Sequence, residues 1–261
     1  MPAPSGPAVP AVLVLGGTSE GRVLATALEK RFGARLRCVT SFATPPAEGL
    51  VPGVVRAGPF SGVAGLTAYL QHERMAAVLV ATHPFAVTIA RNTRLACEAC
   101  QIPRLTLTRP FWMRAVADRW TEVNSMAEAA WRLPSLGRRA FLAIGVRQLP
   151  VFADRPDMWF LVRLRQAVPL PFPLHDPPHG LVIGAGTEAD DLALMRTHAI
   201  EVLVTKASGG AATAGKITAA RTLGLPVLMV RCPPPEPGET TTNVAAAVAW
   251  VETTVLTEAI G

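Results

Sequence analysis

The sequence predicts an α/β fold of two lobes, each a mostly parallel sheet flanked by helices, with a cleft between them. Short β-branched runs alternate with helical patterns through the first half of the 261-residue chain, which is the βαβ rhythm of a parallel sheet. The first run, residues 11–15, leads directly into a glycine-rich turn that opens a helix. A second βα series begins after the break Pro-Ser-Leu-Gly at residues 134–137. We therefore expect two Rossmann-like lobes, residues 1–136 and 137–261.

Each expected element rests on periodicity and on flanking turn residues. In the first lobe the expected strands are residues 11–15, 35–40, 54–57, 77–81 and 104–108, and the expected helices are residues 20–32, 62–73 and 85–100. In the second lobe the expected strands are residues 140–144, 159–165, 181–183, 202–205 and 226–230, and the expected helices are residues 187–198, 212–223 and 243–256. A helical pattern at residues 124–139 precedes the break, and proline-rich loops are expected at residues 169–178 and 233–237. Right-handed crossovers place the carboxyl ends of the strands at one edge of each sheet, where ligands of such sheets bind.

Composition limits the class of protein. Half of the residues are apolar, but no apolar run reaches the roughly 20 residues that span a bilayer. Residues 1–7 lack a basic start and an apolar core, so we expect a disordered tail rather than a signal peptide, and a cytoplasmic protein. The four cysteines, Cys38, Cys97, Cys100 and Cys232, are too few and scattered for a disulfide framework or a zinc site, and we expect buried, unreactive thiols and no bound metal.

The net charge of +6 comes mainly from arginine. Such a balance suits nucleic acid, anionic lipid or an acidic small molecule as a partner. The arginines form no run with interleaved aromatics, and no known nucleic-acid module is present. We expect neither a nucleic-acid nor a membrane partner, which leaves a polyanionic small molecule or an ordinary solvated basic surface.

The glycine-rich turn is the first candidate binding site. Its residues are Gly16, Gly17, Thr18, Ser19, Glu20, Gly21 and Arg22. Glycine lets main-chain N–H groups approach a ligand, and the hydroxyls and the positive end of the helix dipole converge on the same anion. The spacing G-G-x-x-x-G departs from the dinucleotide fingerprint G-x-G-x-x-G. Both a phosphate site and a turn that merely needs small residues stay open on this loop alone.

The end of the second strand distinguishes the two nicotinamide dinucleotides. An NAD site commonly places an acid there to accept the ribose 2′-hydroxyl, whereas a 2′-phosphate excludes a carboxylate. This chain has no acid between residues 38 and 44. Thr40 and Ser41, with Arg22, could serve a 2′-phosphate, so NADPH is favoured over NADH. The alternative is an ordinary polar loop.

Two further loops carry candidate chemistry. His83 follows the strand at residues 77–81 and precedes Pro84, at the ligand-binding edge, where it could contact an anion or move a proton. A structural histidine is an equal alternative. After the strand at residues 202–205, Lys206 adds a cation to a second small-residue loop. Its candidate site residues are Lys206, Ser208, Gly209 and Gly210. We take His83 and Lys206 as candidate catalytic residues, with a mobile surface lysine as the alternative for the second.

Several catalytic motifs are absent. The single tyrosine, Tyr69, is followed four residues later by Glu73, so the Tyr-x-x-x-Lys pair of short-chain dehydrogenases is missing. The sequence contains neither G-x-S-x-G nor H-E-x-x-H. These absences argue against a hydrolase or a zinc enzyme.

Taken in order, four motifs resemble the precorrin-6A reductase family of cobalamin biosynthesis. They are the segment from Gly16 to Ala25, the segment from Ala81 to Ala86, Arg109-Pro110-x-Trp112, and the segment from Thr205 to Gly210. The segment from Lys216 to Val227 also fits, so the resemblance covers nearly the whole chain. Two positions depart from the family pattern: Val80 stands where an acid is expected, and Cys232 interrupts the Arg-Pro that usually ends the last strand.

The resemblance implies an NADPH-dependent oxidoreductase acting on a CH–CH group. It would reduce one carbon–carbon double bond of the precorrin-6A macrocycle to give precorrin-6B, a step in forming the corrin ring of vitamin B12. The implied partner is a polycarboxylate tetrapyrrole, with transient hand-over to neighbouring pathway enzymes. The glycine turn with Thr40 and Ser41 would bind NADPH, and the Lys206 loop would close the cleft on the nicotinamide or on substrate carboxylates. The alternatives are an NADPH-binding sensor without turnover and a different NADPH-dependent reductase.

Overall fold

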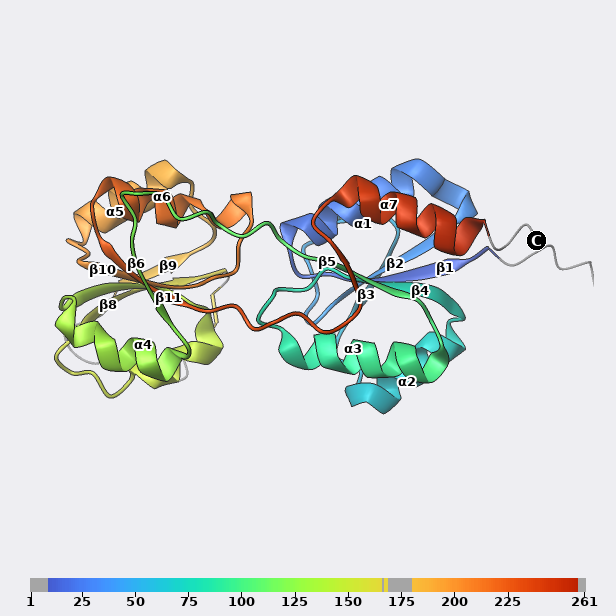
Figure 1. Cartoon of the computed structure of the whole chain (residues 1–261), viewed down its shortest axis with the longest axis horizontal. Coiled ribbons are helices and arrows are strands. Elements are labelled where there is room, and N and C mark those ends of the chain that lie inside the picture. The colour runs from blue at the N-terminus through green and yellow to red at the C-terminus, as the bar shows by residue number, and fades with distance from the viewer. Residues whose placement is uncertain (1–8, 166, 169–179, 258–261) are drawn as a thin grey trace, which may run out of the picture. The chain divides into compact units, whose positions relative to one another are not determined.

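The computed structural model describes residues 9–165, 167–168 and 180–257 and divides the chain into two compact units (Figure 1). The first unit comprises residues up to Arg109 and from Pro233 onwards, and the second comprises Pro110–Cys232. Each contains a six-stranded sheet whose described pairings are all parallel. The two-lobed α/β fold predicted from the sequence is thus confirmed. The expectations for residues 1–7 and 169–178 fall on or overlap residues outside the described part.

The first unit has the strand order of a doubly wound dinucleotide-binding sheet. Its strands are β1 (Ala11–Leu15), β2 (Arg37–Phe42), β3 (Val54–Ala57), β4 (Met75–Val80), β5 (Arg104–Leu107) and β12 (Glu239–Thr241). Its α-helices are α1 (Ser19–Phe32), α2 (Gly62–His72), α3 (Val87–Cys100) and α7 (Val244–Val251), and a π-helical turn at Glu252–Leu256 extends α7. The order across the sheet is β12-β5-β4-β1-β2-β3. The direction of winding reverses between β1 and β4, which is where ligands of such sheets bind.

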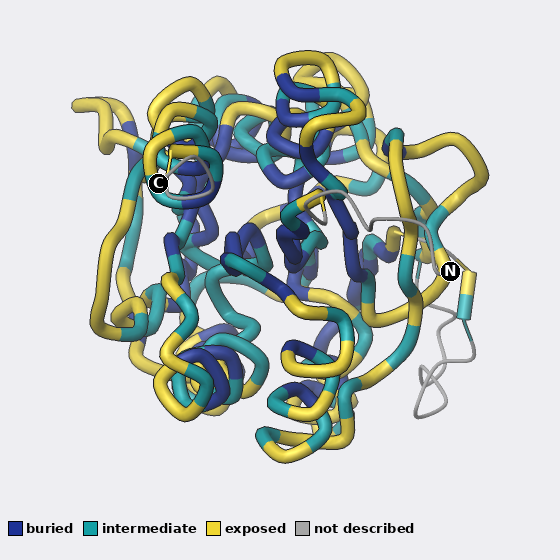
Figure 2. Tube along the Cα trace, turned by 90° about the vertical axis from the view of Figure 1, so that its right-hand side faces the viewer, coloured by how far each residue is buried: buried dark blue, intermediate teal, exposed yellow. Residues whose placement is uncertain are grey.

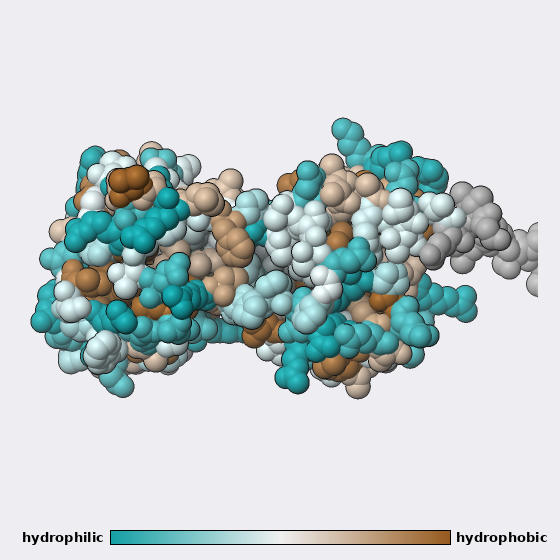
Figure 3. All heavy atoms as spheres, in the orientation of Figure 1, coloured by the Kyte–Doolittle hydropathy of each residue, from teal (hydrophilic) through white to brown (hydrophobic). Residues whose placement is uncertain are grey.

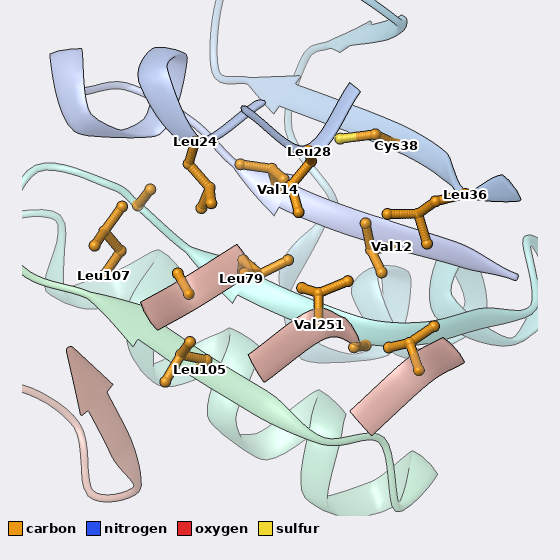
Figure 4. Close-up of a cluster of buried hydrophobic side chains, with 14 of the residues drawn as sticks. Val12, Val14, Leu24, Leu28, Leu36, Cys38, Leu79, Leu105, Leu107 and Val251 are labelled. Carbon is orange, nitrogen blue, oxygen red and sulfur yellow. The ribbon is translucent and has the colours of Figure 1, made fainter. Parts of the chain in front are cut away.

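The core of the first unit lies on both faces of its sheet. Helices α1 and α7 cover one face, and α2 and α3 cover the other (Figure 1). Figure 4 shows Leu24 and Leu28 of α1 and Val251 of α7 pointing toward Val12 and Val14 of β1, and all five are fully buried. Burying a leucine or valine side chain contributes roughly 1.5–3 kcal/mol. Buried residues lie in the strands and on the sides of the helices that face the sheet, while the opposite sides of the helices are exposed (Figure 2).

The second unit repeats the same layout. Its strands are β6 (Arg119–Val123), β7 (Arg139–Ala143), β8 (Trp159–Leu164), β9 (Gly180–Ile183), β10 (Val202–Lys206) and β11 (Pro226–Val230). Its α-helices are α4 (Met126–Arg132), α5 (Glu188–Thr197) and α6 (Gly215–Thr222). It also has 3-10 turns at Leu133–Ser135, Val146–Phe152 and Ala211–Thr213, and the first unit has one at Gly33–Arg35. The order is β6-β11-β10-β7-β8-β9, so the winding reverses between β7 and β10. Helices α5 and α6 cover one face and α4 the other (Figure 1).

The local pattern located most elements within a few residues. Helix α5 begins with a capping box, in which Thr187 accepts from the Asp190 backbone N–H and the Asp190 carboxylate accepts from the Thr187 backbone N–H. Sequence analysis missed β6 and β12. Both are short, have polar residues at most positions and lie at the edge of a sheet, so they carry no apolar run that periodicity detects.

The structure divides the chain differently from the boundary expected after residue 136. Strand β6 pairs with β11, which places residues 110–136 in the second unit. Strand β12 pairs with β5, and α7 buries Ala247 and Val251 in the core of the first unit. The proline break at residues 134–137 is only a 3-10 turn between α4 and β7. Local breaks do not reveal which sheet a later segment joins, because that choice depends on long-range pairing.

The surface carries both hydrophobic and hydrophilic residues. Figure 3 shows hydrophobic residues in small separate groups among hydrophilic ones on the face in view. No helix in the described part of the chain has both the length and the apolar character needed to cross a membrane.

Candidate functional site

The glycine turn lies at the carboxyl end of β1, beside the point where the first sheet reverses its winding. Thr18 is the N-cap of α1 and accepts a hydrogen bond from the Gly21 backbone N–H at 3.1 Å. The same hydroxyl donates to the carbonyl of Ala81, after β4, at 2.8 Å. Thr18 is 2% exposed. Its hydroxyl therefore starts the helix and ties the two loops together, and is not directed at a ligand.

Main-chain donors at this turn are available for an anion. Within the described residues, the backbone N–H groups of Thr18 and Ser19 have no hydrogen-bond partner. The N–H of Gly16 is used, since it donates to the carbonyl of Ser41 at 2.9 Å. The unpaired groups stand at the positive end of the 14-residue helix α1, where the helix dipole also attracts negative charge.

Glycine is needed for different structural reasons at the two positions on either side of these donors, Gly17 and Gly21. Gly17 has φ +135°, a conformation that side chains disfavour, and a Cβ there would lie 4.0 Å from the backbone nitrogen of His83. Gly21 allows α1 to approach β4, because a Cβ there would lie 3.0 Å from the Cβ of Ala81. The turn therefore requires glycine at position 17 for its backbone conformation and at position 21 for close packing, as in the phosphate-binding turn of a dinucleotide site.

An ion pair that sequence analysis did not find fixes the turn from its other side. The Arg109 Nε lies 2.8 Å from the Glu20 carboxylate, and Ser19 Oγ donates to the same carboxylate at 3.0 Å. Burial alone raises the pKa of Glu20, but a hydrogen bond from its own backbone and the charge of Arg109 outweigh it, so the pKa lies below that of an ordinary glutamate. The Arg109 side chain is 3% exposed, and its Nη1 is buried without a hydrogen-bond partner among the described residues.

A buried guanidinium nitrogen without a partner is unusual, since buried polar groups are nearly always hydrogen-bonded. Arg109 Nη1 is therefore a candidate donor to an anion beside the glycine turn. The Arg109-Pro110 dipeptide belongs to the motifs that carry the family resemblance. That motif was the sequence feature that could have marked Arg109 as a candidate site residue. Its distance of 89 residues from Glu20 gave no reason to pair the two.

The three residues expected to contact a 2′-phosphate differ in their burial and in their hydrogen bonds. Thr40 is completely buried in β2, and its Oγ1 has no hydrogen-bond partner among the described residues. Ser41 is buried at the end of β2 and accepts a hydrogen bond from Arg56 Nη1 at 3.2 Å. Arg22 is half-buried in the first turn of α1, and its side chain contacts no hydrogen-bond or ion-pair partner in the described part of the chain.

His83 lies in the loop after β4, next to the glycine turn. Its Nδ1 accepts a hydrogen bond from the Phe85 backbone N–H at 3.2 Å. In the neutral ring this leaves the proton on Nε2. This hydrogen bond orients the imidazole at the carboxyl edge of the first sheet.

Lys206 ends β10, at the carboxyl edge of the second sheet. Burial lowers the pKa of Lys206 below that of an ordinary lysine. Ser208, Gly209 and Gly210 are buried, and the N–H of Gly210 donates to the carbonyl of Pro110 at 3.0 Å. The Gly210 carbonyl accepts from the Trp112 indole at 2.9 Å. These main-chain groups therefore hold the segment that follows Arg109, and Lys206 is left as the charged group of the loop.

The shared layout of the two sheets shows which of their loops correspond. Strand β10 occupies in the second sheet the position that β4 occupies in the first. The Lys206 loop thus corresponds to the His83 loop, and the counterpart of the glycine turn follows β7. There Gly145, with φ +83°, precedes the 3-10 turn that carries the exposed Arg147. Sequence analysis did not single out these two residues, because they form no glycine pair.

Comparisons with known proteins decide the family. The family model described as precorrin-6x reductase CbiJ/CobK matches residues 11–252. The chain belongs to this family. A precorrin-6A reductase of Rhodococcus erythropolis is 43% identical over 247 residues, covering 93% of this chain and 97% of the relative. A precorrin-6A reductase of a Sinorhizobium species is 39% identical over 223 residues, covering 85% of this chain and 84% of the relative.

A solved structure agrees with this family. The structure of CobK precorrin-6A reductase matches with a TM-score of 0.85 and 35% identity, covering 94% of this chain and 98% of its own. The family predicted from the ordered motifs is therefore confirmed, and so is the two-lobed Rossmann-like arrangement of sheets.

Proposed function

We propose that this protein is an NADPH-dependent precorrin-6A reductase, which reduces one carbon–carbon double bond of the macrocycle to give precorrin-6B. The observation that carries the proposal is the glycine turn. In a chain of this family, unpaired main-chain donors stand at a helix start beside the reversal point of a parallel sheet. That is where such sheets bind the phosphates of a dinucleotide.

The residues of the first unit fit a dinucleotide phosphate. The unpaired N–H groups of Thr18 and Ser19 and the buried Nη1 of Arg109 supply donors without acceptors. Gly16, Gly17, Glu20, Gly21 and Arg22 shape or flank the turn, and Ser41 lies beside it. When bound, NADPH supplies the hydride. The lack of an acid after β2 favours a phosphorylated ribose over an unmodified one.

The second unit suits the carboxylates of a tetrapyrrole. Lys206 provides a partly desolvated cation at its carboxyl edge, and Arg147 provides an exposed one at the adjacent loop. In this proposal Lys206, with Ser208, Gly209 and Gly210 shaping its loop, holds substrate carboxylates or contacts the nicotinamide. His83 contacts substrate or delivers the proton that accompanies the hydride. An extended conjugated macrocycle accepts hydride without the tyrosine relay that a ketone needs.

The reaction is tested with purified protein, NADPH and metal-free precorrin-6A. We expect the nicotinamide absorbance to fall and mass spectrometry to show a product heavier by one hydride and one proton. Retained NADPH binding with steady absorbance would instead favour a sensor without turnover. Oxidation of NADPH only with some other acceptor would point to a different reductase. A reaction with precorrin-6A that proceeds without any nicotinamide cofactor would contradict the proposal.

The binding site is tested by titrating a Gly17→Leu variant with NADPH. The leucine would have to adopt φ +135° within the turn, so we expect a large loss of affinity. Gly33→Leu is the matched control, because Gly33 also has positive φ, has open space around it and lies at the opposite end of α1. Undiminished affinity in the Gly17 variant would rule out the turn as the phosphate site.

A further inference from the structure

An arginine that sequence analysis did not select is held rigidly at the carboxyl edge of the first sheet. Arg56 is near the end of β3, paired in register with Ser41 of β2. Its Nη1 donates to Ser41 Oγ at 3.2 Å and to the carbonyl of Gly58 at 2.6 Å, and its Nη2 donates to the carbonyl of Pro59 at 2.8 Å. The guanidinium lies 3.6 Å from the centre of the Phe60 ring. These contacts fix the orientation of the group.

No carboxylate in the described part of the chain forms an ion pair with Arg56. In the described ranges Arg56 forms no ion pair, whereas Arg37 of β2 pairs with Glu73 at 2.8 Å and Arg109 pairs with Glu20. Three of the five guanidinium N–H groups are used by the contacts above. The Nε–H and one Nη2–H therefore remain without a partner among the described residues. A preorganised cation with spare donors is suited to an anion.

The position of Arg56 suggests which anion. The Gly16 N–H donates to the Ser41 carbonyl, so the glycine turn is joined directly to the strand end that Arg56 contacts. In dinucleotide-binding sheets the adenosine ribose lies beside the end of the second strand, where an acid accepts the 2′-hydroxyl or an arginine accommodates a 2′-phosphate. Here that strand end has Ser41 and Arg56 side by side and no acid between residues 38 and 47.

We propose that Arg56 is the residue that selects the 2′-phosphate, and hence NADPH over NADH. This inference rests on the proposed function, since it assumes that the first unit binds the cofactor. The guanidinium would donate its two spare N–H groups to the phosphate, and the Ser41 hydroxyl, which accepts from Arg56, would be oriented to donate to it as well. Arg22 is the competing candidate, because it is also unpaired beside the turn.

The experiment compares the affinities of four proteins and one control variant for NADP⁺ and for NAD⁺ by titration calorimetry. They are the wild type and the variants Arg56→Gln, Arg56→Lys and Arg22→Gln. Arg35→Gln is the matched control, since it removes the same charge from an exposed site before β2, at the opposite edge of the sheet. Loss of charge-assisted hydrogen bonds predicts that Arg56→Gln weakens NADP⁺ binding by about 10- to 100-fold. Binding of NAD⁺ should change by less than about threefold.

The possible results distinguish a failure of this inference about Arg56 from a failure of the proposed function. We expect Arg56→Lys to fall between the wild type and Arg56→Gln, because lysine keeps the charge and loses the planar fork. The inference alone would be overturned if the wild type prefers NADP⁺ and the Arg56→Gln variant keeps this preference. It would also be overturned if only the Arg22→Gln variant loses the preference. An Arg56→Gln variant that loses both cofactors equally also contradicts a selective role. A wild type that binds neither cofactor would overturn the proposed function itself.

Discussion

The Arg109 guanidinium and the Glu20 carboxylate form a 2.8 Å ion pair that joins the last residue of the first segment to the first turn of α1. Arg109 is the residue before the chain leaves the first unit, and Glu20 lies in the turn proposed to bind the cofactor. The charge of Glu20 thus compensates a buried cation, and the carboxylate also receives the Ser19 hydroxyl. The pair fixes the shape of the turn before any ligand binds.

Replacing Glu20 with glutamine should destabilise the protein, because a buried guanidinium would lose its counter-charge. We expect a loss of about 1 to 3 kcal/mol in the free energy of unfolding, measured by urea denaturation near neutral pH. Glu48→Gln is the control, since Glu48 is exposed. Equal stabilities of the Glu20 variant and the wild type would show that the pair contributes nothing net.

The same pair predicts a dependence on pH. Because the folded-state pKa of Glu20 is lowered, its contribution is fully present above the ordinary glutamate pKa of about 4.3 and is lost as the pH falls through the lower folded value. The stability difference between wild type and Glu20→Gln should therefore shrink in that acidic range. Denaturation measured across the range tests this, and a difference that stays constant with pH would contradict it.

Gly21 should not tolerate a larger residue, because α1 would be pushed away from β4. A Cβ at this position already lies 3.0 Å from Ala81 Cβ and 3.2 Å from the Ala81 carbonyl, and overpacking of this kind costs about 1 to 3 kcal/mol. We expect Gly21→Val to lower both stability and NADPH affinity. Adding Ala81→Gly should recover part of the stability, as measured in a double-mutant cycle. A strictly additive cycle would indicate that the two residues are not in contact.

Lys206 should contribute to the binding of a polycarboxylate substrate. We expect Lys206→Gln to raise KM for precorrin-6A by about 10-fold or more, the size of a charge-assisted interaction. Because burial lowers the pKa of Lys206, the wild-type kcat/KM should decline at a pH below the ordinary lysine range, and the variant should lack this limb. Arg196→Gln, an exposed site at the end of α5, is the control. An unchanged KM would remove Lys206 from the site.

Two cysteines should react slowly in the folded protein. Burial raises the pKa of Cys38 to about 11 and that of Cys97 to about 12, so few thiolates form at mildly alkaline pH. We expect iodoacetamide to modify them at least about 100-fold more slowly than after unfolding. Peptide mass spectrometry over time gives the rate at each site. Rapid native labelling of Cys97 would show that α3 opens readily.

The local sequence was sufficient for most elements and for the location of the turn. The apolar run of β1 followed by Gly16 and Gly17 predicts a strand, a tight turn and a helix from short-range chemistry alone, and the structure has each of them. Likewise the helix expected over residues 187–198 is present as α5, with Thr187 as its N-cap. These features depend on residues within a few positions of one another, so periodicity and capping rules detect them.

What the sequence by itself determined was the α/β class, the ordered motifs of the family and the absence of an acid after the second strand. The tertiary structure decided the rest. It assigned α7 and β12 to the first unit, used the Thr18 hydroxyl to cap α1, buried Thr40 in β2, and brought Arg109 to Glu20 and Arg56 to Ser41. Each of these outcomes depends on which strands lie side by side. Strand order joins residues far apart in the chain, and no local pattern of apolar and polar residues encodes it.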